Sequence, residues 1–288
     1  MPTTIVSAKS HRVRIAPGRK TVAIGDRCNT LGSKKIRDAV AMGAWDRVVE
    51  VAKKQFDAGA QILDVNMVGM DIPEKVLLPM AVAAIRSSVD APLAIDFGDP
   101  EALDLALEKA GGRCLVNSIS GETEKLETIM PIAKKHGAAM VALLCDDDGI
   151  PETPEGRLWV ANAIIEHGTR FGFTLDDYLF DCIATGVATD INAGTCTLAT
   201  IDMVRRELGA NMTLGASNVS FGMPRRRAID AHYLALAISR GVNAPMTDVT
   251  NEALRWAMLT TDAIMGTDKL GIKFIRETRK EDRKETNG

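Results

Sequence analysis

Four polar side chains interrupt apolar stretches of the sequence and are the first candidates for chemistry. Asp96, Asn117 and Asp181 each follow apolar residues directly, and Asn218 stands in the segment Thr213-Leu-Gly-Ala-Ser-Asn218-Val-Ser. A carboxylate or an amide in such a run is costly to bury unless it is hydrogen-bonded or paired. Brought together, these groups would accept hydrogen bonds from a ligand that carries N–H donors.

The segment around Asn218 has the composition of a strand end that is kept open. Gly215, Ala216 and Ser217 stand where a core strand would carry Val, Ile or Leu. A Gly and a Pro then precede the arginines 225–227, which begin a helical pattern. The missing side-chain volume indicates that a ligand lies against this segment.

Further polar residues lie within or directly after apolar runs that are expected to be strands, near the ends of those strands. They are Asn29, Asp64, Asn66, Asp146, Ser217 and Asp248. Lys and Arg are nearly absent from the same strand ends, so salt bridging does not explain the acids. A site of this composition suits a neutral, donor-bearing ligand and disfavours a phosphate, which barrels hold on backbone amides and cations.

Each acid also has a structural interpretation. Asp64 is equally suited to orienting loops, Asp146 to a turn or helix cap in Asp-Asp-Asp-Gly-Ile-Pro, and Asp248 to capping the last helix. A divalent metal is the competing explanation for clustered Asp. However, the four histidines lie at the N-terminus or in predicted helices, so we predict no metal.

The elements that must position these residues alternate eight times along the chain. Short apolar runs are expected at 22–28, 62–68, 92–97, 114–119, 140–145, 178–183, 212–219 and 245–249. Helical patterns are expected at 44–58, 73–88, 100–110, 122–136, 154–171, 194–208, 225–240 and 251–265. Eight strand–helix units predict a (β/α)8 TIM barrel of the α/β class. An open doubly wound sheet is the alternative, but no G-x-G-x-x-G follows the first run.

The two ends lie outside this alternation, and we expect one domain spanning 1–288. Residues 1–20 contain a possible N-terminal hairpin, at 4–20, that would close the bottom of the barrel. Residues 273–288 are nearly all charged and predict a frayed helix or a disordered tail.

Composition narrows the partners and the compartment. The chain of 288 residues has a net charge of −3, so there is no basic field for nucleic acid or an acidic membrane. The five cysteines form no C-x-x-C pair and predict reduced thiols. With no apolar leader or long apolar window, we expect a soluble, cytoplasmic protein.

Taken in order, these strand ends resemble the pterin-binding barrel family, and within it the methyltetrahydrofolate:corrinoid methyltransferases. The resemblance covers about residues 21–270. It rests on Ile24-Gly-Asp-Arg-Cys-Asn29, Ile62-Leu-Asp-Val-Asn66, Ile95-Asp96, Val116-Asn-Ser118, Gly149-Ile-Pro151, Phe180-Asp181 and Gly215-Ala-Ser-Asn-Val-Ser220.

The resemblance implies that tetrahydrofolate or 5-methyltetrahydrofolate binds in the barrel mouth. Asp96 and Asp181 would accept from the pterin, Asn117 would both donate and accept, and Asn218 would lie near N5. Asn218 and Asp181 are the implied catalytic residues. The implied binding residues are Asp96, Asn117, Asp181, Ser217, Asn218, Asn29, Asp64 and Asn66. The family also implies a homodimer.

The corrinoid would be carried by a partner protein, because Asp230-Ala-His-Tyr-Leu-Ala235 only approaches a corrinoid-binding pattern and lies within a predicted helix. The family's acetogenic type has a polar amide where this chain has Phe221. The alternatives are a dihydropteroate synthase-like enzyme, a folate-binding barrel without chemistry, and an unrelated metal-dependent barrel enzyme. The first is disfavoured because 215–218 and 247–251 contain no Lys, Arg or His.

Overall fold

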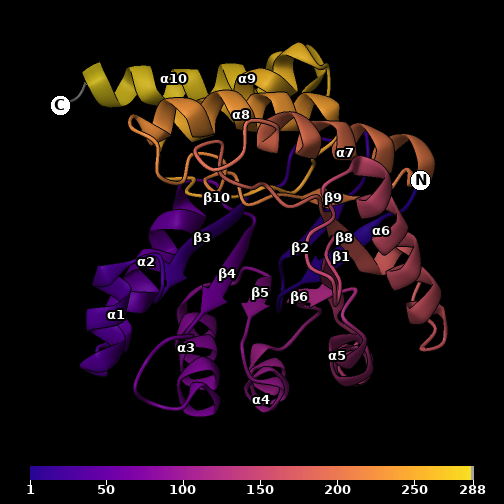
Figure 1. Ribbon diagram of the computed structural model, residues 1–288. Coiled ribbons are helices and arrows are strands. Elements are labelled where there is room, and N and C mark those ends of the chain that lie inside the picture. The colour runs from indigo at the N-terminus through magenta and orange to yellow at the C-terminus, as the bar shows by residue number, and fades with distance from the viewer. Residues whose placement is uncertain (287–288) are drawn as a thin grey trace.

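A computed structural model describes residues 1–286 and contains an eight-stranded parallel sheet that curves into a barrel (Figure 1). The sheet order is β10-β3-β4-β5-β6-β7-β8-β9. The strands are β3 (Ile24–Asn29), β4 (Ile62–Asn66), β5 (Leu93–Asp96), β6 (Leu115–Ser120), β7 (Ala139–Leu143), β8 (Tyr178–Asp181), β9 (Met212–Thr213) and β10 (Met246–Thr247). Beyond the two short strands, Met246 donates to the Leu214 carbonyl at 2.9 Å and so joins the sheet edges. The predicted (β/α)8 barrel is confirmed.

Helices follow the strands and surround the sheet (Figure 1). They are α1 (Lys34–Ala41), α2 (Trp45–Asp57), α3 (Glu74–Ser88), α4 (Pro100–Ala110), α5 (Thr123–Lys135), α6 (Pro154–Thr169), α7 (Ala193–Leu208), α8 (Arg226–Arg240), α9 (Glu252–Ile264) and α10 (Ile272–Thr286). Two 3-10 turns, η1 (Leu175–Asp177) and η2 (Lys269–Gly271), precede β8 and α10. Helix α1 was not expected, because Gly32 and the charges of 34–38 obscure its short periodic pattern.

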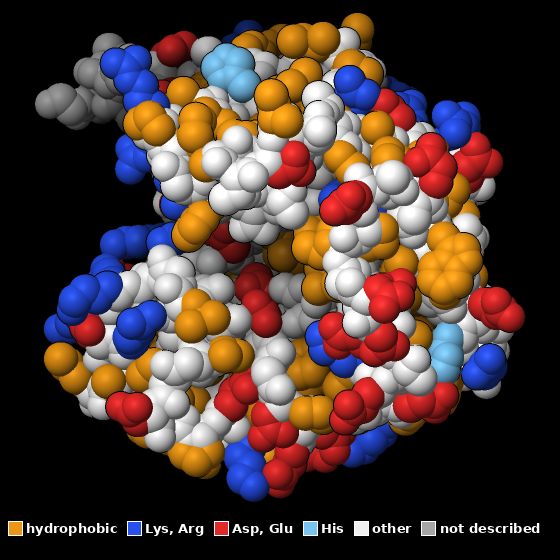
Figure 2. Space-filling model, in the orientation of Figure 1, with side chains coloured by type: hydrophobic (Ala, Val, Ile, Leu, Met, Phe, Trp, Pro, Cys, Tyr) orange, Lys and Arg blue, Asp and Glu red, His pale blue; other side chains and the backbone are white. Residues whose placement is uncertain are grey.

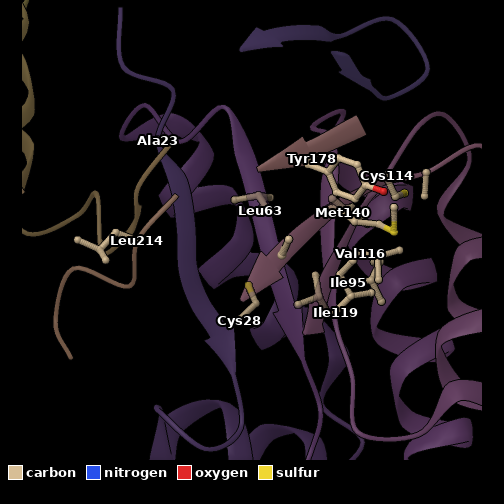
Figure 3. Packing of buried hydrophobic residues seen from close by; sticks show 14 of the residues in the cluster. Ala23, Cys28, Leu63, Ile95, Cys114, Val116, Ile119, Met140, Tyr178 and Leu214 are labelled. Atoms are coloured by element: carbon tan, nitrogen blue, oxygen red, sulfur yellow. The ribbon is translucent and has the colours of Figure 1, made fainter. Parts of the chain in front are cut away.

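Side chains that point outward from the strands form the larger hydrophobic cluster, against the helices. Leu63, Ile95, Val116 and Met140 belong to it, and all four are fully buried. Figure 3 shows these residues with Tyr178 and Cys114. Burial of both faces of a parallel sheet explains why the strands read as nearly continuous apolar runs.

Side chains that point inward at the amino-terminal end of the strands form a second cluster with an N-terminal hairpin. Strands β1 (Thr4–Ser7) and β2 (Arg12–Ile15) pair antiparallel. Their Val6, Val13 and Ile15 pack with inward residues of the barrel strands, which include Ile24, Ile62, Ala94, Leu115, Val141 and Leu179. This end of the barrel interior is therefore closed mainly by apolar side chains, which leaves the opposite end for a polar site.

The C-terminal charged segment is a helix that packs on the barrel and is not a disordered tail. Asp268 accepts from the backbone N–H groups of Lys273 and Phe274, at 3.1 and 2.9 Å, and so caps the start of α10. The Phe274 ring packs edge-on against Trp256 of α9, with ring centroids 5.4 Å apart. The charged residues of this segment suggest disorder in the sequence, but in the structure they lie mainly on the exposed face of α10. The last two residues of the predicted tail, 287–288, lie outside the described part of the chain.

Side chains cap the starts of α4 and α9, and the capping role expected of Asp248 is wrong. Asp99 accepts from Glu101 N at 2.9 Å ahead of Pro100, the first residue of α4. Helix α9 is capped by Asn251 and not by Asp248, whose carboxylate binds Thr250 instead. Asp146 stabilises its own turn by accepting from Asp148 N at 3.1 Å. Among the helices of residues 1–286, none has the length and apolar character that a membrane span requires.

Candidate active site

The inward face of the barrel changes from apolar to polar along each strand. Because successive strand residues alternate between faces, residues two apart share one face. Ile62 is thus followed on the inward face of β4 by Asp64 and Asn66, and Leu179 on β8 by Asp181. The same alternation places Asp96 of β5 above Ala94 and Asn117 of β6 above Leu115. The predicted polar residues therefore project into one end of the barrel.

Sheet register aligns four of these residues in one row. Asn29 pairs with Asn66, Asn66 with Asp96, and Asp96 with Asn117, across the consecutive strands β3 to β6. Asp181 is in register with Thr213 of β9 on the other side of the barrel. The row lies at the carboxyl ends of the strands, where barrel enzymes build their sites. Figure 2 shows a hollow in this orientation, with acidic side chains inside it.

Asp64 and Asn117 are hydrogen-bonded across the barrel interior. The Asn117 Nδ2 donates to Asp64 at 2.9 Å and also lies 3.6 Å from the Met246 sulfur. Asp64 is only 3 % exposed. Its burial, followed by the charge of Asp96, raises its pKa well above the usual range, and the hydrogen bond from Asn117 partly opposes this. Because both neighbours face Nδ2, the Asn117 Oδ1 is left to accept from a ligand.

Asp96 has Asn66 as its side-chain partner. Burial raises the pKa of Asp96 to about 6, while hydrogen bonds from Asn66 and the Phe97 backbone lower it. The Asn66 Oδ1 is already used, because it accepts from Val68 N at 2.9 Å. Asn66 therefore orients Asp96 and the loop after β4.

Asp181 lies at the base of the opposite wall. Burial raises its pKa to about 6, opposed by a hydrogen bond from Ile183 N at 2.7 Å and by the charge of Arg157. Arg157 of α6 is 4 % exposed and donates to the carbonyls of Pro151, Cys182 and Ile183. The guanidinium is thus bound by the segment before α6 and by the loop after β8, and Asp181 keeps an oxygen for a ligand.

Asp26 is a further candidate for the site, which the sequence analysis did not predict. It is inward-facing on β3, two residues after Ile24, where the register with β4 shifts between Gly25 and Cys28. Its Oδ1 is buried and has no hydrogen-bond partner, and burial raises its pKa to about 6. An unpaired buried acceptor at a barrel mouth is the group that a ligand donor would satisfy. Asp26 is a polar residue inside the apolar strand Ile24–Asn29, and this pattern could have indicated it alongside Asn29.

Cations at the strand ends are more numerous than expected. Arg27 Nε on β3 lies 3.8 Å from the Oδ2 of Asp248, the residue after β10. The negative charge of this predicted acid is therefore partly balanced. Arg226 at the start of α8 reaches the turn after β9, where its Nη2 donates to the Ser217 carbonyl at 2.7 Å. Both arginines bind protein groups at the rim.

Asn218 and Ser217 do not lie in a strand. The predicted run 212–219 ends as a strand at Thr213, because Gly215 to Asn218 form a turn closed by Asn218 N donating to the Gly215 carbonyl at 3.3 Å. Asn218 is exposed, and a Cβ on Gly215 would come within 2.9 Å of its Nδ2. The small residues of this segment thus leave space for the Asn218 side chain. Asn29 also has a local role, since its Oδ1 accepts from Leu31 N at 2.8 Å.

A metal cluster and the Asp230-Ala-His232 segment are the two remaining features that the sequence raised. Within residues 1–286, no group of three or more His, Cys, Asp or Glu has the arrangement of a metal site. In the Asp230-Ala-His232 segment of α8, Asp230 is buried and the His232 Nδ1 lies 2.7 Å from the Ala228 carbonyl. That segment is part of the continuous helix α8.

Comparison with known proteins gives a family and several relatives. Residues 25–248 match the family described as pterin binding enzyme. The chain is 28% identical over 228 residues to methylcorrinoid:tetrahydrofolate methyltransferase of Eubacterium limosum, covering 78% of this chain and 84% of that protein. It is 31% identical over 232 residues to methionine synthase of Mycobacterium leprae, but spans only 19% of that protein's length.

Among solved structures, dihydropteroate synthase of Yersinia pestis has the same fold. The TM-score is 0.69 at 15% sequence identity, covering 91% of this chain and 98% of that chain. A second structure of that enzyme, with a pterine-sulfa conjugate, has a TM-score of 0.68 at 17% identity. At these identities the likeness establishes the barrel and not the reaction.

Proposed function

Because the chain belongs to the pterin-binding enzyme family, we propose that it transfers a methyl group between N5 of tetrahydrofolate and the cobalt of a corrinoid held by a separate protein. The relative from Eubacterium limosum, whose name states this pair of reactants, supports the choice within the family. The observation that carries it is the group of hydrogen-bond acceptors at the mouth: Asp96, the Asn117 Oδ1 and Asp181.

These acceptors match the donors of a pterin. Its 2-amino group and ring N–H lie along one edge of a flat ring, and each needs an acceptor once water is excluded. Carboxylates with pKa values raised to about 6, as in Asp96 and Asp181, are charged at neutral pH and poorly solvated. They therefore gain more from a charge-assisted hydrogen bond than exposed carboxylates would.

We assign Asn218 to the reacting end of the ligand. A tertiary amine is a poor leaving group, so N5 must gain a proton or a strong hydrogen bond as its methyl group departs. An amide cannot supply that proton itself, but it can bind N5 and a water molecule that does. The exposed position of Asn218 on its turn leaves its side chain available for this role.

The corrinoid supplies the cobalt that accepts or returns the methyl group. The barrel's own part is to hold the folate with N5 toward the open mouth, so that the corrinoid protein can approach from outside. A corrinoid carried by a separate protein is consistent with α8, since the Asp230-Ala-His232 segment lies within that continuous helix and Asp230 is buried.

The test is calorimetry with tetrahydrofolate and 5-methyltetrahydrofolate, together with turnover of 5-methyltetrahydrofolate with free cob(I)alamin. Binding of both folates and formation of methylcobalamin are the expected results. Folate binding without methyl transfer to cob(I)alamin or to a corrinoid protein would instead favour a folate-binding barrel. Absence of folate binding would reject the pterin site.

A further inference from the structure

Arg226, the first residue of α8, binds the turn that carries Asn218. Its Nε donates to the Ser220 hydroxyl at 2.9 Å and its Nη2 donates to the Ser217 carbonyl at 2.7 Å. Asn218 lies between these two residues in the chain. A single guanidinium with two donors in fixed geometry therefore holds both sides of the Asn218 position.

Asp230 lies one helical turn after Arg226 and is 5 % exposed. Its Oδ1 is buried and has no hydrogen-bond partner. Burial raises the pKa of this carboxyl, while the Ser220 hydroxyl and the charge of Arg226 lower it. The acid thus faces the same two groups that hold the turn, and its negative charge favours keeping the guanidinium over the turn.

In the described part of the chain, the Asn218 side chain has no hydrogen-bond partner. Within residues 1–286, the hydrogen bonds of Asn218 are made by its backbone, to Gly215 and Phe221. The position of its amide in the mouth therefore depends on the geometry of the turn. The backbone bond from Val187 N to the Val219 carbonyl, at 3.0 Å, fixes one further point of that turn.

We infer that Arg226 is a positioning residue for Asn218, and that Asp230 in turn restrains Arg226. The inference depends on the proposed function, because it concerns the amide assigned to N5. It also gives the Asp230 carboxyl, a buried acid in the segment that approaches a corrinoid pattern, a part in the folate site.

The alternative is that Arg226 contacts the ligand directly. Arg226 is exposed, and its guanidinium carbon lies 6.0 Å from the ring of Phe221, which is 70% exposed. A direct contact would contribute to folate affinity, whereas a positioning role acts on the rate through Asn218. The two roles are separated by measuring binding and rate for the same variants.

The experiment compares R226A, R226K, N218A and the double variant N218A/R226A, with R227A as the matched control from the exposed neighbour. Single-turnover methyl transfer from 5-methyltetrahydrofolate to cob(I)alamin gives the rate, and calorimetry gives the tetrahydrofolate Kd. We expect R226A to slow transfer by about 10- to 100-fold, the usual cost of a misplaced reacting group. The Kd should change less than about threefold, because the pterin acceptors are untouched.

The double variant is the decisive measurement. If Arg226 acts through Asn218, N218A/R226A is no slower than N218A alone. R226K should remain slow, because an ammonium does not reproduce the two-point guanidinium geometry. R227A should behave as the unmodified protein. A wild-type rate in R226A, or a double variant whose losses multiply while Kd rises, would overturn the inference.

Failure of the proposed function is recognised separately, because the unmodified protein would then transfer no methyl group. In that case crystal structures of the unmodified protein and R226A still decide the positioning role. A displaced 217–221 turn with an otherwise unchanged barrel supports it, and an unchanged turn rejects it.

Discussion

Asn117 of β6 donates its Nδ2 to Asp64 of β4 at 2.9 Å, reaching past the intervening strand β5. This contact makes Asp64 an orienting residue for the Asn117 amide, since the acid is only 3 % exposed and lies below the row of strand ends. The sequence left two interpretations of Asp64, a ligand contact and a structural residue that orients loops, and this geometry favours an orienting role, directed at Asn117.

Removing the carboxylate should release the Asn117 amide. We expect D64A to weaken tetrahydrofolate binding by about tenfold, the cost of one lost orienting hydrogen bond. Calorimetry measures this, with D57A on the exposed end of α2 as the control. Unchanged affinity in D64A would mean that Asn117 is held by other contacts.

Folate affinity should depend on pH through the mouth carboxyls. Asp96 and Asp181 have pKa values raised to about 6, so both lose their acceptor charge as the pH falls through this value. We expect the tetrahydrofolate Kd to rise steadily from pH 7.5 to pH 5, and the slope to be smaller in D181N, which has one titrating group fewer. A slope that D181N leaves unchanged would assign the pH dependence to the ligand.

Stability should increase when Asp181 is neutralised. Its pKa rises from 3.8 to about 6 on folding, so the unfolded chain releases this proton first and the carboxyl lowers stability as the pH rises from about 4 to 6. We expect D181N to raise the free energy of unfolding by on the order of 2 kcal/mol at pH 8, because one pKa unit is worth about 1.4 kcal/mol. Part of the gain is offset by the charge left on Arg157.

Denaturant unfolding of D181N at two pH values checks this prediction. The stabilisation should disappear near pH 4, where the native carboxyl is already protonated. Equal gains at both pH values would point to a change in packing and not to titration of Asp181.

Asn218 should affect the rate of methyl transfer more than folate binding. Loss of one preorganised hydrogen bond to a developing charge usually costs about 10²- to 10³-fold in rate, so we expect N218A to reduce methyl transfer to this extent. The tetrahydrofolate Kd should rise only modestly. Equal losses in rate and affinity would indicate that Asn218 contributes uniform binding.

Gly215 should be required for the position of that amide. In G215A the new Cβ would lie 2.9 Å from the Asn218 Nδ2, closer than carbon and nitrogen atoms pack. Because the Asn218 side chain is exposed and can move, folding should be preserved while the transfer rate falls by about tenfold or more. Thermal unfolding and single-turnover rates measure the two effects, with G194A, whose Cβ would meet only ordinary contacts at 3.7 Å, as a control for the glycine substitution itself.

The sequence by itself determined the barrel and the polar ends of its strands. Alternating apolar runs and helical patterns are local signals, and β4 and α4 begin where those patterns predict. Asp96, Asn117 and Asp181 are recognisable because each is a polar residue that interrupts an apolar run. The local pattern failed where tertiary contacts replace it, as in β9, which ends at Thr213 because the sheet closes there through Leu214 and Met246.

Only the tertiary structure decided which residues share a contact. The Asn117–Asp64 hydrogen bond joins residues that lie far apart in the sequence. The contact of Arg226 with the Asn218 turn and the unpaired Asp26 oxygen likewise follow from no periodic spacing. Their arrangement depends on barrel curvature, strand register and the position of α8, which no local pattern encodes. Burial, which raises the pKa values of the mouth acids, is likewise a property of the folded chain.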